Sequence, residues 1–417
     1  MKPSISTNVL KFKKTKSPVR EIMDLANPQF FRKAGLDPEK VISFSGGWVN
    51  HEAPDGLRNA YASIIHDSKR FHASGAYPPT LGMPECRQAL VDFEKHLYGE
   101  QMRLSVENIA IGCNSSQMTS NLMQIVLSPG DKLCLPDPSY SNYPSQTISL
   151  QKVEIIRFPL LDTEKWEYAA DRRIEDFVKF ILTEKPKMVL LCAPDNPTSQ
   201  ILSDEFVTAT LNAVSETGGF LVIDFAYKEL VWDEKLPEYF SWGPTDNFIS
   251  IHSNSKWCRG LGRRLGWVEA PVEIVEAFEA IQSSTILCPD TLHQMALVDY
   301  IKKGIAENSI KPYIQKTAAL YLKAAERTVA AIEKHLKLPC LTPQGGLYTI
   351  VKTGVESSEF VRTVMSKTGV IMVPGWGFGK TLENAVRLSY GPLVNDLDKI
   401  DEAMKRVGEF LNNEADF

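Results

Sequence analysis

The chain has 417 residues, more than one hydrophobic core usually organises, so two or three domains are expected. Its 43% apolar and 23% charged residues describe an ordinary globular protein, and a net charge of −5 gives no support to nucleic-acid binding, which favours a basic protein. No apolar run approaches the length of about 18 residues that a membrane-spanning helix needs.

The N-terminal segment MKPSISTNVLKFKKTKSPVR has several lysines and no acidic residue. Because it lacks the apolar stretch of a secretory signal, it is interpreted as a solvated basic arm, with a transit peptide as the alternative. The seven cysteines are scattered, without a CxxC pair or a cysteine–histidine cluster. Neither a disulfide framework nor a metal site is therefore expected, and a reducing, cytoplasmic location fits.

Short apolar runs alternate with helical stretches from about residue 105 to 270. Helices are expected over residues 115–127, 174–185 and 204–217. The apolar runs have no period of two, as is typical of strands buried on both faces. This alternation predicts an α/β fold with a mainly parallel sheet covered by helices. The six predicted strands are 108–113, 132–138, 153–159, 187–194, 219–225 and 248–253.

A long helical stretch, 309–336, leads into a second, smaller α+β domain. That domain has strand candidates of its own and closes with a helix over 397–411. We therefore expect three parts: an N-terminal arm packed on the small domain, a large domain that holds the functional site, and the small C-terminal domain. Their predicted bounds are 1–50, 51–300 and 301–417.

The polar residues that follow each predicted strand belong together, because ligands of such sheets bind at the carboxyl ends of the strands. Ser115, Ser116 and Gln117 follow the first strand at the start of a helix. Free backbone N–H groups and the helix dipole make this an anion site, although a simple helix cap explains the same residues.

Four further residues follow other strands. Tyr140 lies on a loop, where packing is the alternative role, and Asn196 lies in a segment that also suits a plain turn. Asp224 directly follows four apolar residues, so it is expected to be buried and to need a cationic partner or several donors. Tyr227, three residues later, is placed to face the same cavity.

Lys256 ends the segment FISIHSNSK, and Arg264 lies in the glycine-rich turn after it. An arginine binds phosphate with two parallel hydrogen bonds. A lysine in an apolar pocket has a lowered pKa, which makes it a nucleophile toward aldehydes. A phosphate, an aldehyde and a cationic partner for Asp224 together indicate one cofactor, pyridoxal 5′-phosphate. Its aldehyde would bond Lys256, and its phosphate would meet Arg264 and residues 115–117.

Six motifs in family order carry a resemblance over residues 40–395. The segment YPPTLGMPECRQAL resembles the element Y-x4-G-x-P-x-x-R, and SNSK is followed by G-x-R-x-G. The chain resembles the class I/II pyridoxal-phosphate-dependent aminotransferases, which have the aspartate aminotransferase fold, called fold type I. FSGGWVNHEAP loosely resembles the GGxPN element of the aminoadipate and kynurenine aminotransferases, with Trp48 and Val49 as departures. The other motifs are PGDKLCLPDPSY, APDNPTS, LVIDFAY and VRLSYG.

The resemblance implies roles in holding the cofactor. Lys256 would form the Schiff base and then carry a proton, and Asp224 would keep the ring nitrogen protonated. Asn196 and Tyr227 would bond the ring oxygen, and Tyr140 would stack on the ring. Tyr77 would reach the phosphate of a neighbouring subunit, which implies a homodimer with shared sites. The phosphate would be held by Ser115, Ser116, Gln117, Ser253 and Arg264.

The resemblance also implies a substrate site. Arg387 would grip the substrate α-carboxylate, with an ordinary surface arginine as the alternative, and Gly47 and Asn196 would lie beside it. Aspartate aminotransferases place a partner arginine where residues 280–294 hold no Arg or Lys, so dicarboxylic substrates are disfavoured. Asp290 in that segment suits either a basic substrate side chain or a helix cap, and Arg263 has no assigned role.

Three functions follow. The favoured one is an aminotransferase that moves an amino group from a neutral, aromatic or basic L-amino acid to a 2-oxo acid. The alternative is another reaction of the same cofactor and fold, as in lyases or the oxidases and cyclases of arginine-like substrates, since fold alone does not choose among them. A non-catalytic binding protein is disfavoured because Lys256 is present and the fold begins too early for an added DNA-binding domain.

Overall fold

The structure is a computed structural model that describes residues 5–14, 18–150, 152–233 and 235–413. Its larger sheet has seven strands in the order β2-β10-β9-β8-β7-β3-β4. Only β10 runs antiparallel to its neighbours in this sheet, so the predicted α/β fold with a mainly parallel sheet is confirmed. The strands are β2 (Ile109–Gly112), β3 (Lys132–Asp137), β4 (Glu154–Pro159), β7 (Met188–Cys192), β8 (Phe220–Asp224), β9 (Phe248–Ser253) and β10 (Gly266–Glu269).

All six predicted strands of this sheet are present, and β10 was not predicted. It is four residues long and directly follows the glycine- and arginine-rich turn, so no long apolar run marks it. Every residue of β2, β7, β9 and β10 is buried, as expected for a sheet covered on both faces.

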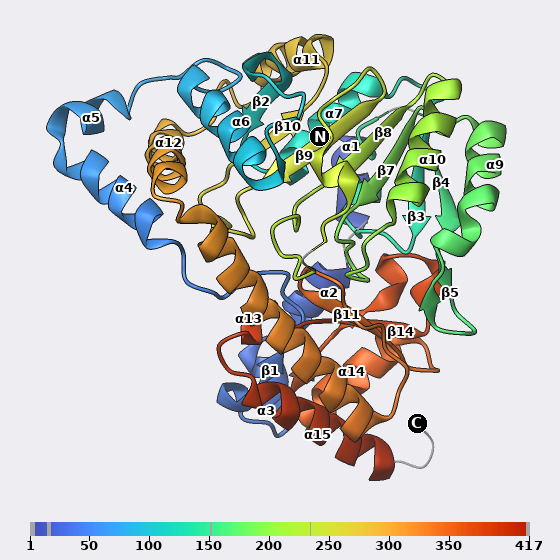
Figure 1. Ribbon diagram of the computed structural model, residues 1–417. Coiled ribbons are helices and arrows are strands. Elements are labelled where there is room, and N and C mark those ends of the chain that lie inside the picture. Colours follow the sequence, from blue (N-terminus) through green and yellow to red (C-terminus); the bar gives the residue numbers. More distant parts are fainter. Residues whose placement is uncertain (1–4, 15–17, 151, 234, 414–417) are drawn as a thin grey trace, which may run out of the picture.

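Helices cover both faces of this sheet (Figure 1). Helices α7 and α11 pack with the apolar residues of one face, and α6, α9, α10 and α12 pack with those of the other. Their bounds are α6 (Pro84–Tyr98), α7 (Ser115–Val126), α9 (Ile174–Glu184), α10 (Asp204–Glu216), α11 (Val272–Ser284) and α12 (Thr291–Ala306).

Helix α13 (Ile310–Ala331) runs from the region of the large sheet to a second sheet with the order β11-β14-β13 (Figure 1). The predicted helix 309–336 is thus shorter as an α-helix, because its last turn, Ile332–Leu336, is π-helical and ends at Lys337, whose φ is 55°. The small sheet and its helices are β11 (Tyr348–Lys352), β13 (Val373–Pro374), β14 (Ala385–Ser389), α14 (Ser357–Thr368) and α15 (Asp398–Asn413).

The N-terminal segment packs against this second body. Strand β1 (Ile42–Ser43) pairs in parallel with β12 (Val370–Ile371), and Ile22 and Phe31 are buried in the same apolar core as residues of α14 and α15. The three domain bounds given above remain predictions. The remaining helices are α1 (Thr7–Lys14), α2 (Pro18–Leu25), α3 (Pro28–Lys33), α4 (Asp55–His66), α5 (Ser68–Ala73) and α8 (Tyr143–Gln146), and β5 (Leu161–Asp162) pairs with β6 (Glu167–Tyr168).

In the part of the chain that the structure describes, no helix combines the length and the apolar character needed to span a membrane.

Candidate active site

A cavity opens at the carboxyl ends of β2, β7, β8 and β9. Eight of the predicted site residues line it: Ser115, Ser116, Tyr140, Asn196, Asp224, Tyr227, Lys256 and Arg264. The other lining residues are Asn114, Tyr143, Cys192, Ala226, Ser255 and Leu261.

One end of the cavity is the start of helix α7. The Asn114 side chain caps this helix by accepting a hydrogen bond from the Gln117 backbone N–H at 2.9 Å. The first N–H groups of a helix have no intrahelical acceptor, so those of Ser115 and Ser116 are available to an anion. Gly266 lets β10 approach closely, because a Cβ there would lie 2.6 Å from the Ser115 nitrogen.

Two residues predicted to contact the phosphate, Gln117 and Ser253, direct their side chains to other protein groups. The Gln117 side chain accepts from the Cys113 N–H at 2.9 Å and does not line the cavity. The Ser253 hydroxyl donates to the Ser255 hydroxyl at 2.7 Å, and Ser255 is the serine that faces the cavity. Ser255, two residues after the predicted Ser253, is therefore the serine of this turn that lines the cavity.

The two neighbouring arginines diverge. Arg264 has a left-handed backbone, with φ of 56°, donates to the Leu261 carbonyl at 2.7 Å and lines the cavity. Arg263 instead places its guanidinium carbon 4.5 Å from the centre of the Tyr61 ring on α4. This contact gives Arg263 a packing partner that the sequence analysis did not find.

Asp224 lies at the end of β8 and is 5% exposed. Its carboxylate accepts from the Tyr143 hydroxyl at 2.9 Å and from the Ala226 N–H at 3.0 Å. Burial raises the pKa of Asp224 to about 6, against the lowering effect of Tyr143, Ala226 and Lys256. No cation among the described residues forms an ion pair with this carboxylate, so the site suits a ligand that carries a positive charge beside it.

Lys256 points into the same cavity, where its ammonium donates to the Gly47 carbonyl at 2.5 Å. Loss of hydration inside the cavity lowers the pKa of Lys256 to about 8, and the nearby positive charges of Arg387 and Arg264 lower it further while Asp224 opposes them. A lysine with a lowered pKa has a larger unprotonated fraction near neutral pH, which makes it a better nucleophile.

Arg387, on β14, is buried at 2% exposure and is therefore not a surface arginine. It donates to the Asn196 side-chain oxygen and to the Ser45 carbonyl, both at 3.0 Å. Its guanidinium carbon lies 4.4 Å from the centre of the Tyr348 ring and 4.9 Å from that of the Phe378 ring. The Nε–H has no partner among the described residues, so the buried arginine retains binding capacity for an anion.

Tyr227 is held by a chain of polar contacts. The Asn196 amide donates to its hydroxyl at 3.3 Å, and the Tyr348 hydroxyl lies 2.8 Å from it. Gly47 passes close to this pair, because a Cβ there would lie 2.5 Å from the Tyr348 hydroxyl. Tyr348 begins a strand of the small sheet, and nothing in the sequence pattern placed it beside Tyr227.

Besides Gln117 and Ser253, four further predicted residues are not among those that line the cavity: Gly47, Arg387, Tyr77 and Asp290. Tyr77 is 84% exposed, and the nearby Ala76 carbonyl accepts from the Thr291 hydroxyl at 2.7 Å, so Tyr77 lies on the surface near the 285–290 segment. Asp290 caps helix α12 by accepting from the His293 N–H at 2.6 Å, which is the capping alternative given above.

This donor set fits pyridoxal 5′-phosphate. The start of α7 and Arg264 suit its phosphate, Asp224 suits a protonated ring nitrogen, and Lys256 suits its aldehyde. Tyr143 and Ser255 were missed by the sequence analysis, because Tyr143 begins the four-residue helix α8 and Ser255 lies in the turn after β9, and neither segment has a pattern of its own.

Comparisons with known proteins agree with this geometry. The profile of the family "Aminotransferase class I and II" matches residues 40–407. An aspartate aminotransferase of Pyrococcus horikoshii is 25% identical over 414 residues, which cover 98% of each chain. An LL-diaminopimelate aminotransferase of Maridesulfovibrio salexigens is 26% identical over 375 residues, covering 88% of this chain and 91% of the relative. The solved structure of the Thermus thermophilus aspartate aminotransferase with maleate aligns with a TM-score of 0.81 at 20% identity, covering 97% of this chain and 100% of that one.

Proposed function

Because the chain belongs to the class I and II aminotransferases and is a pyridoxal-phosphate-dependent enzyme, we propose that it takes the amino group from a neutral, aromatic or basic L-amino acid and passes it to a 2-oxo acid.

The proposed substrate class is supported by the cations that line the cavity, because none of those described is left over to pair with a second substrate carboxylate. Among the lining residues that the structure describes, Lys256 and Arg264 are the cations, and the proposal assigns both to the cofactor. Arg387 is assigned to the α-carboxylate, and Arg259 donates to the His51 carbonyl and to the Asn50 side chain. A second carboxylate on the substrate would be buried without a cationic partner, which is costly.

The relatives from Pyrococcus horikoshii, Pyrococcus abyssi and a Bacillus species that are named aspartate aminotransferase are 25%, 25% and 23% identical, so their substrate is not transferred to this chain. Relatives at similar identity are named for LL-diaminopimelate and for aspartate or prephenate. The same family therefore includes enzymes named for different substrates, and the residues of this cavity are the better guide.

In the proposed mechanism, Arg387 binds the substrate α-carboxylate and orients the α-hydrogen toward Lys256. The Lys256 amine, once released, removes that proton and returns it to another carbon, so it acts as general base and then as general acid. Bound pyridoxal phosphate supplies an aldehyde for the amino group and a ring that accepts electrons.

Other residues of the site bind and orient the cofactor and take no part in the proton transfer. The Asp224 carboxylate stabilises a positive charge on the ring nitrogen, because it is buried and forms no ion pair with a cation of the described residues. Asn196 and Tyr227 orient the ring oxygen, and the backbone at the start of α7 anchors the phosphate with Arg264. These groups fix the orientation of the reacting atoms toward Lys256.

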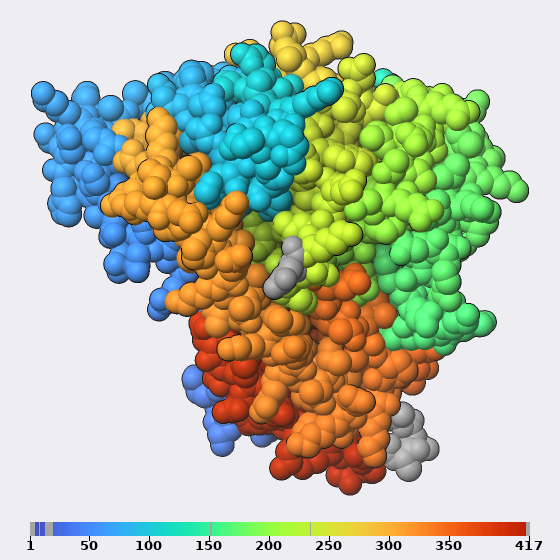
Figure 2. Space-filling view, viewed as in Figure 1, coloured from blue at the N-terminus to red at the C-terminus, as the bar shows by residue number. Residues whose placement is uncertain are grey.

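We also propose a homodimer with shared sites. The α4–α5 segment projects from the body of the chain (Figures 1 and 2), and Tyr77 follows it with 84% of its surface exposed. Phe71, six residues before Tyr77, and Leu287, within 280–294, are also exposed, so apolar surface lies near both places that the family resemblance assigns to a partner's site.

An amino-acid screen with the purified holoenzyme tests the substrate class. The half-reaction is followed by the change in cofactor absorbance and by identification of the oxo acid formed. We expect kcat/KM for the best neutral, aromatic or basic amino acid to exceed that for aspartate and glutamate. A kcat/KM for aspartate above those of all such amino acids refutes the proposed pocket, and release of ammonia without an acceptor refutes transamination.

A further inference from the structure

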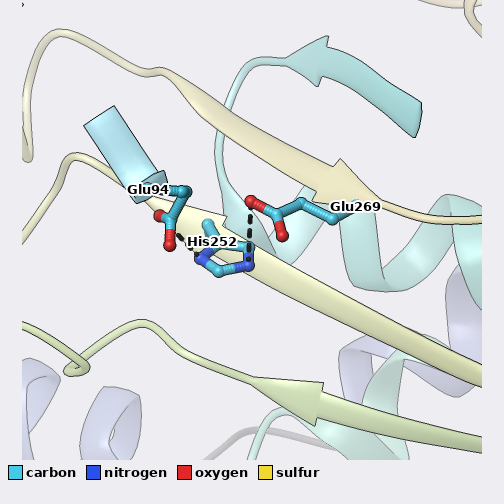
Figure 3. A group of neighbouring side chains, drawn as sticks. All are labelled: Glu94, His252 and Glu269. Atoms are coloured by element: carbon cyan, nitrogen blue, oxygen red, sulfur yellow. Dashed lines mark ion pairs between the residues drawn. The ribbon is translucent and has the colours of Figure 1, made fainter. Parts of the chain in front are cut away.

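A group of four charged or titratable side chains lies buried beside the candidate active site, and none of them lines the cavity. Glu94 comes from α6, Lys228 follows β8, His252 lies on β9 and Glu269 ends β10. All four are 0–1% exposed. We call these residues the buried charge cluster, and Figure 3 shows three of them between the sheet and α6.

The cluster lies on the opposite face of the sheet from Asp224. Asp224 pairs with Ile251 in the register of β8 and β9, so Phe225 and His252, the next residues, point to the other face. The His252 ring lies 5.4 Å from the Phe225 ring, centre to centre, and is stacked at 5.1 Å on the Trp267 ring. The cluster and the cavity therefore share two strands but occupy different sides of them.

The geometry of the cluster does not suit one metal ion. The two ring nitrogens of His252 face different carboxylates, Nδ1 toward Glu94 and Nε2 toward Glu269, each at 3.5 Å (Figure 3). An imidazole binds a given ion through one nitrogen. The Lys228 ammonium also lies 2.7 Å from Glu94 and supplies a positive charge.

Charge balance instead requires a bound proton. Lys228 neutralises Glu94, and one proton on the pair of His252 and Glu269 neutralises the second carboxylate. Burial raises the pKa of Glu269 to about 8 and lowers that of His252, so the pair retains this proton at neutral pH. Glu229 is also buried nearby, and burial raises its pKa to about 8.

Lys228 connects this cluster to the active site. Its ammonium lies 3.7 Å from the centre of the Tyr98 ring and 4.8 Å from that of Phe225. Its backbone N–H donates to the Phe225 carbonyl at 3.1 Å, and the next bond of the turn runs from the Leu230 N–H to the Tyr227 carbonyl at 2.8 Å. Tyr227 directly precedes Lys228 in this turn, and the turn follows Asp224, the last residue of β8.

We propose that Lys228 is a positioning residue: its ammonium, bound by Glu94 in the buried charge cluster, fixes the turn from which Asp224 and Tyr227 reach the cofactor. The inference rests on the proposed roles of these two residues. Without the ion pair, Lys228 and Glu94 would each be buried without compensation, and the turn would shift to rehydrate or separate them. A shift of about 1 Å at a reacting group costs about 100-fold in rate.

Three variants separate positioning from a structural role. Lys228→Met removes the charge and keeps a similar chain length. The double variant Glu94→Gln/Lys228→Met removes both charges, so no uncompensated buried charge remains. Lys187→Met is the control, because the Lys187 ammonium likewise donates to an oxygen acceptor, here the Gly218 carbonyl at 2.9 Å, and lies over the Phe220 ring, but near the surface.

The readouts are the thermal midpoint of the apoprotein, the dissociation constant of pyridoxal phosphate and the pH midpoint of the bound cofactor's absorbance. We expect Lys228→Met to weaken cofactor binding by about tenfold or more and to shift the absorbance midpoint. The double variant should recover the thermal midpoint but keep the spectral shift. Lys187→Met should change neither the cofactor affinity nor the absorbance midpoint.

Recovery of both the thermal and the spectral midpoint in the double variant would show a structural role only and overturn the proposal. An unchanged absorbance midpoint in Lys228→Met also overturns the proposal. So does the finding of one equivalent of bound divalent metal in the wild type that is absent from His252→Asn. Asp224→Asn and Tyr227→Phe serve as references. If neither shifts the absorbance midpoint, the proposed function fails; if both do and Lys228→Met does not, only this inference fails.

Discussion

Replacing Arg387 by lysine tests the proposed grip on the substrate α-carboxylate. Lysine keeps the positive charge in the buried site but loses the planar fork that binds a carboxylate with two hydrogen bonds. The wild-type side chain is held by Asn196, Ser45 and two aromatic rings, so it is rigid before substrate arrives. The mutation therefore removes a preorganised contact rather than a mobile one.

The expected loss follows from one charge-assisted hydrogen bond. Such a bond contributes about 1.5–3 kcal/mol, and each 1.36 kcal/mol is a factor of ten in rate, so kcat/KM should fall by about 10- to 150-fold. Arg387→Ala should lose more and should also unfold at lower temperature. It leaves the Asn196 side chain and the Ser45 carbonyl without their donor.

The assay compares an amino acid with the amine that lacks its carboxylate. Stopped-flow measurement of the half-reaction gives kcat/KM for both substrates in each variant. The lysine variant should react more slowly with the amino acid, through a higher KM and a lower kcat, and should react with the amine as the wild type does. An equal loss for both substrates would refute the grip, because Arg387 would then act through the structure of the site.

Three further predictions follow from other contacts. Arg264→Ala should weaken binding of pyridoxal phosphate by about tenfold in equilibrium dialysis, whereas Arg263→Ala should leave it unchanged, because only Arg264 lines the cavity; equal losses would contradict this assignment. Glu269→Gln should flatten the dependence of unfolding free energy on pH. The Glu269 pKa is raised from 4.5 to about 8 in the folded state, so the unfolded state releases this proton first and the wild type loses stability as pH rises from about 4.5 to 8; chemical denaturation that gives the same slope for both proteins would refute it. Mixing inactive Tyr77→Ala with inactive Lys256→Ala should restore activity in the heterodimer, since one of its sites has both wild-type residues, and no restoration would contradict shared sites.

The strands of the large sheet could be predicted from the sequence because each buried run is followed by polar turn residues. The same rule located Asp224 and Lys256, since Asp224 ends β8 and Lys256 lies in the turn three residues after the end of β9. It failed for β10, which is short and follows a turn rich in glycine and arginine. Patterns of this kind identify the edge of the sheet where a site lies, because that edge is where all the parallel strands end.

The choice of side chain within a turn could not be predicted. Ser253 and Ser255 are two residues apart, and only the folded turn decides that Ser255 faces the cavity. Tyr348 joins the site from the second sheet, so its place depends on how two separate bodies pack. Lys228 and Glu94 are 134 residues apart, and neither has a sequence pattern that pairs it with the other.

The most direct test of the central claim is chemical trapping of the cofactor on its lysine. Wild-type holoenzyme treated with borohydride should lose its visible absorbance and carry one reduced pyridoxal phosphate on the peptide that contains Lys256, as mass spectrometry of the digest would show. Lys256→Ala should bind the cofactor without trapping it, because the aldehyde has no amine in the cavity to bond. A borohydride-trapped adduct on another residue of the wild type, or an equal yield of adduct in Lys256→Ala, would contradict the assignment of Lys256.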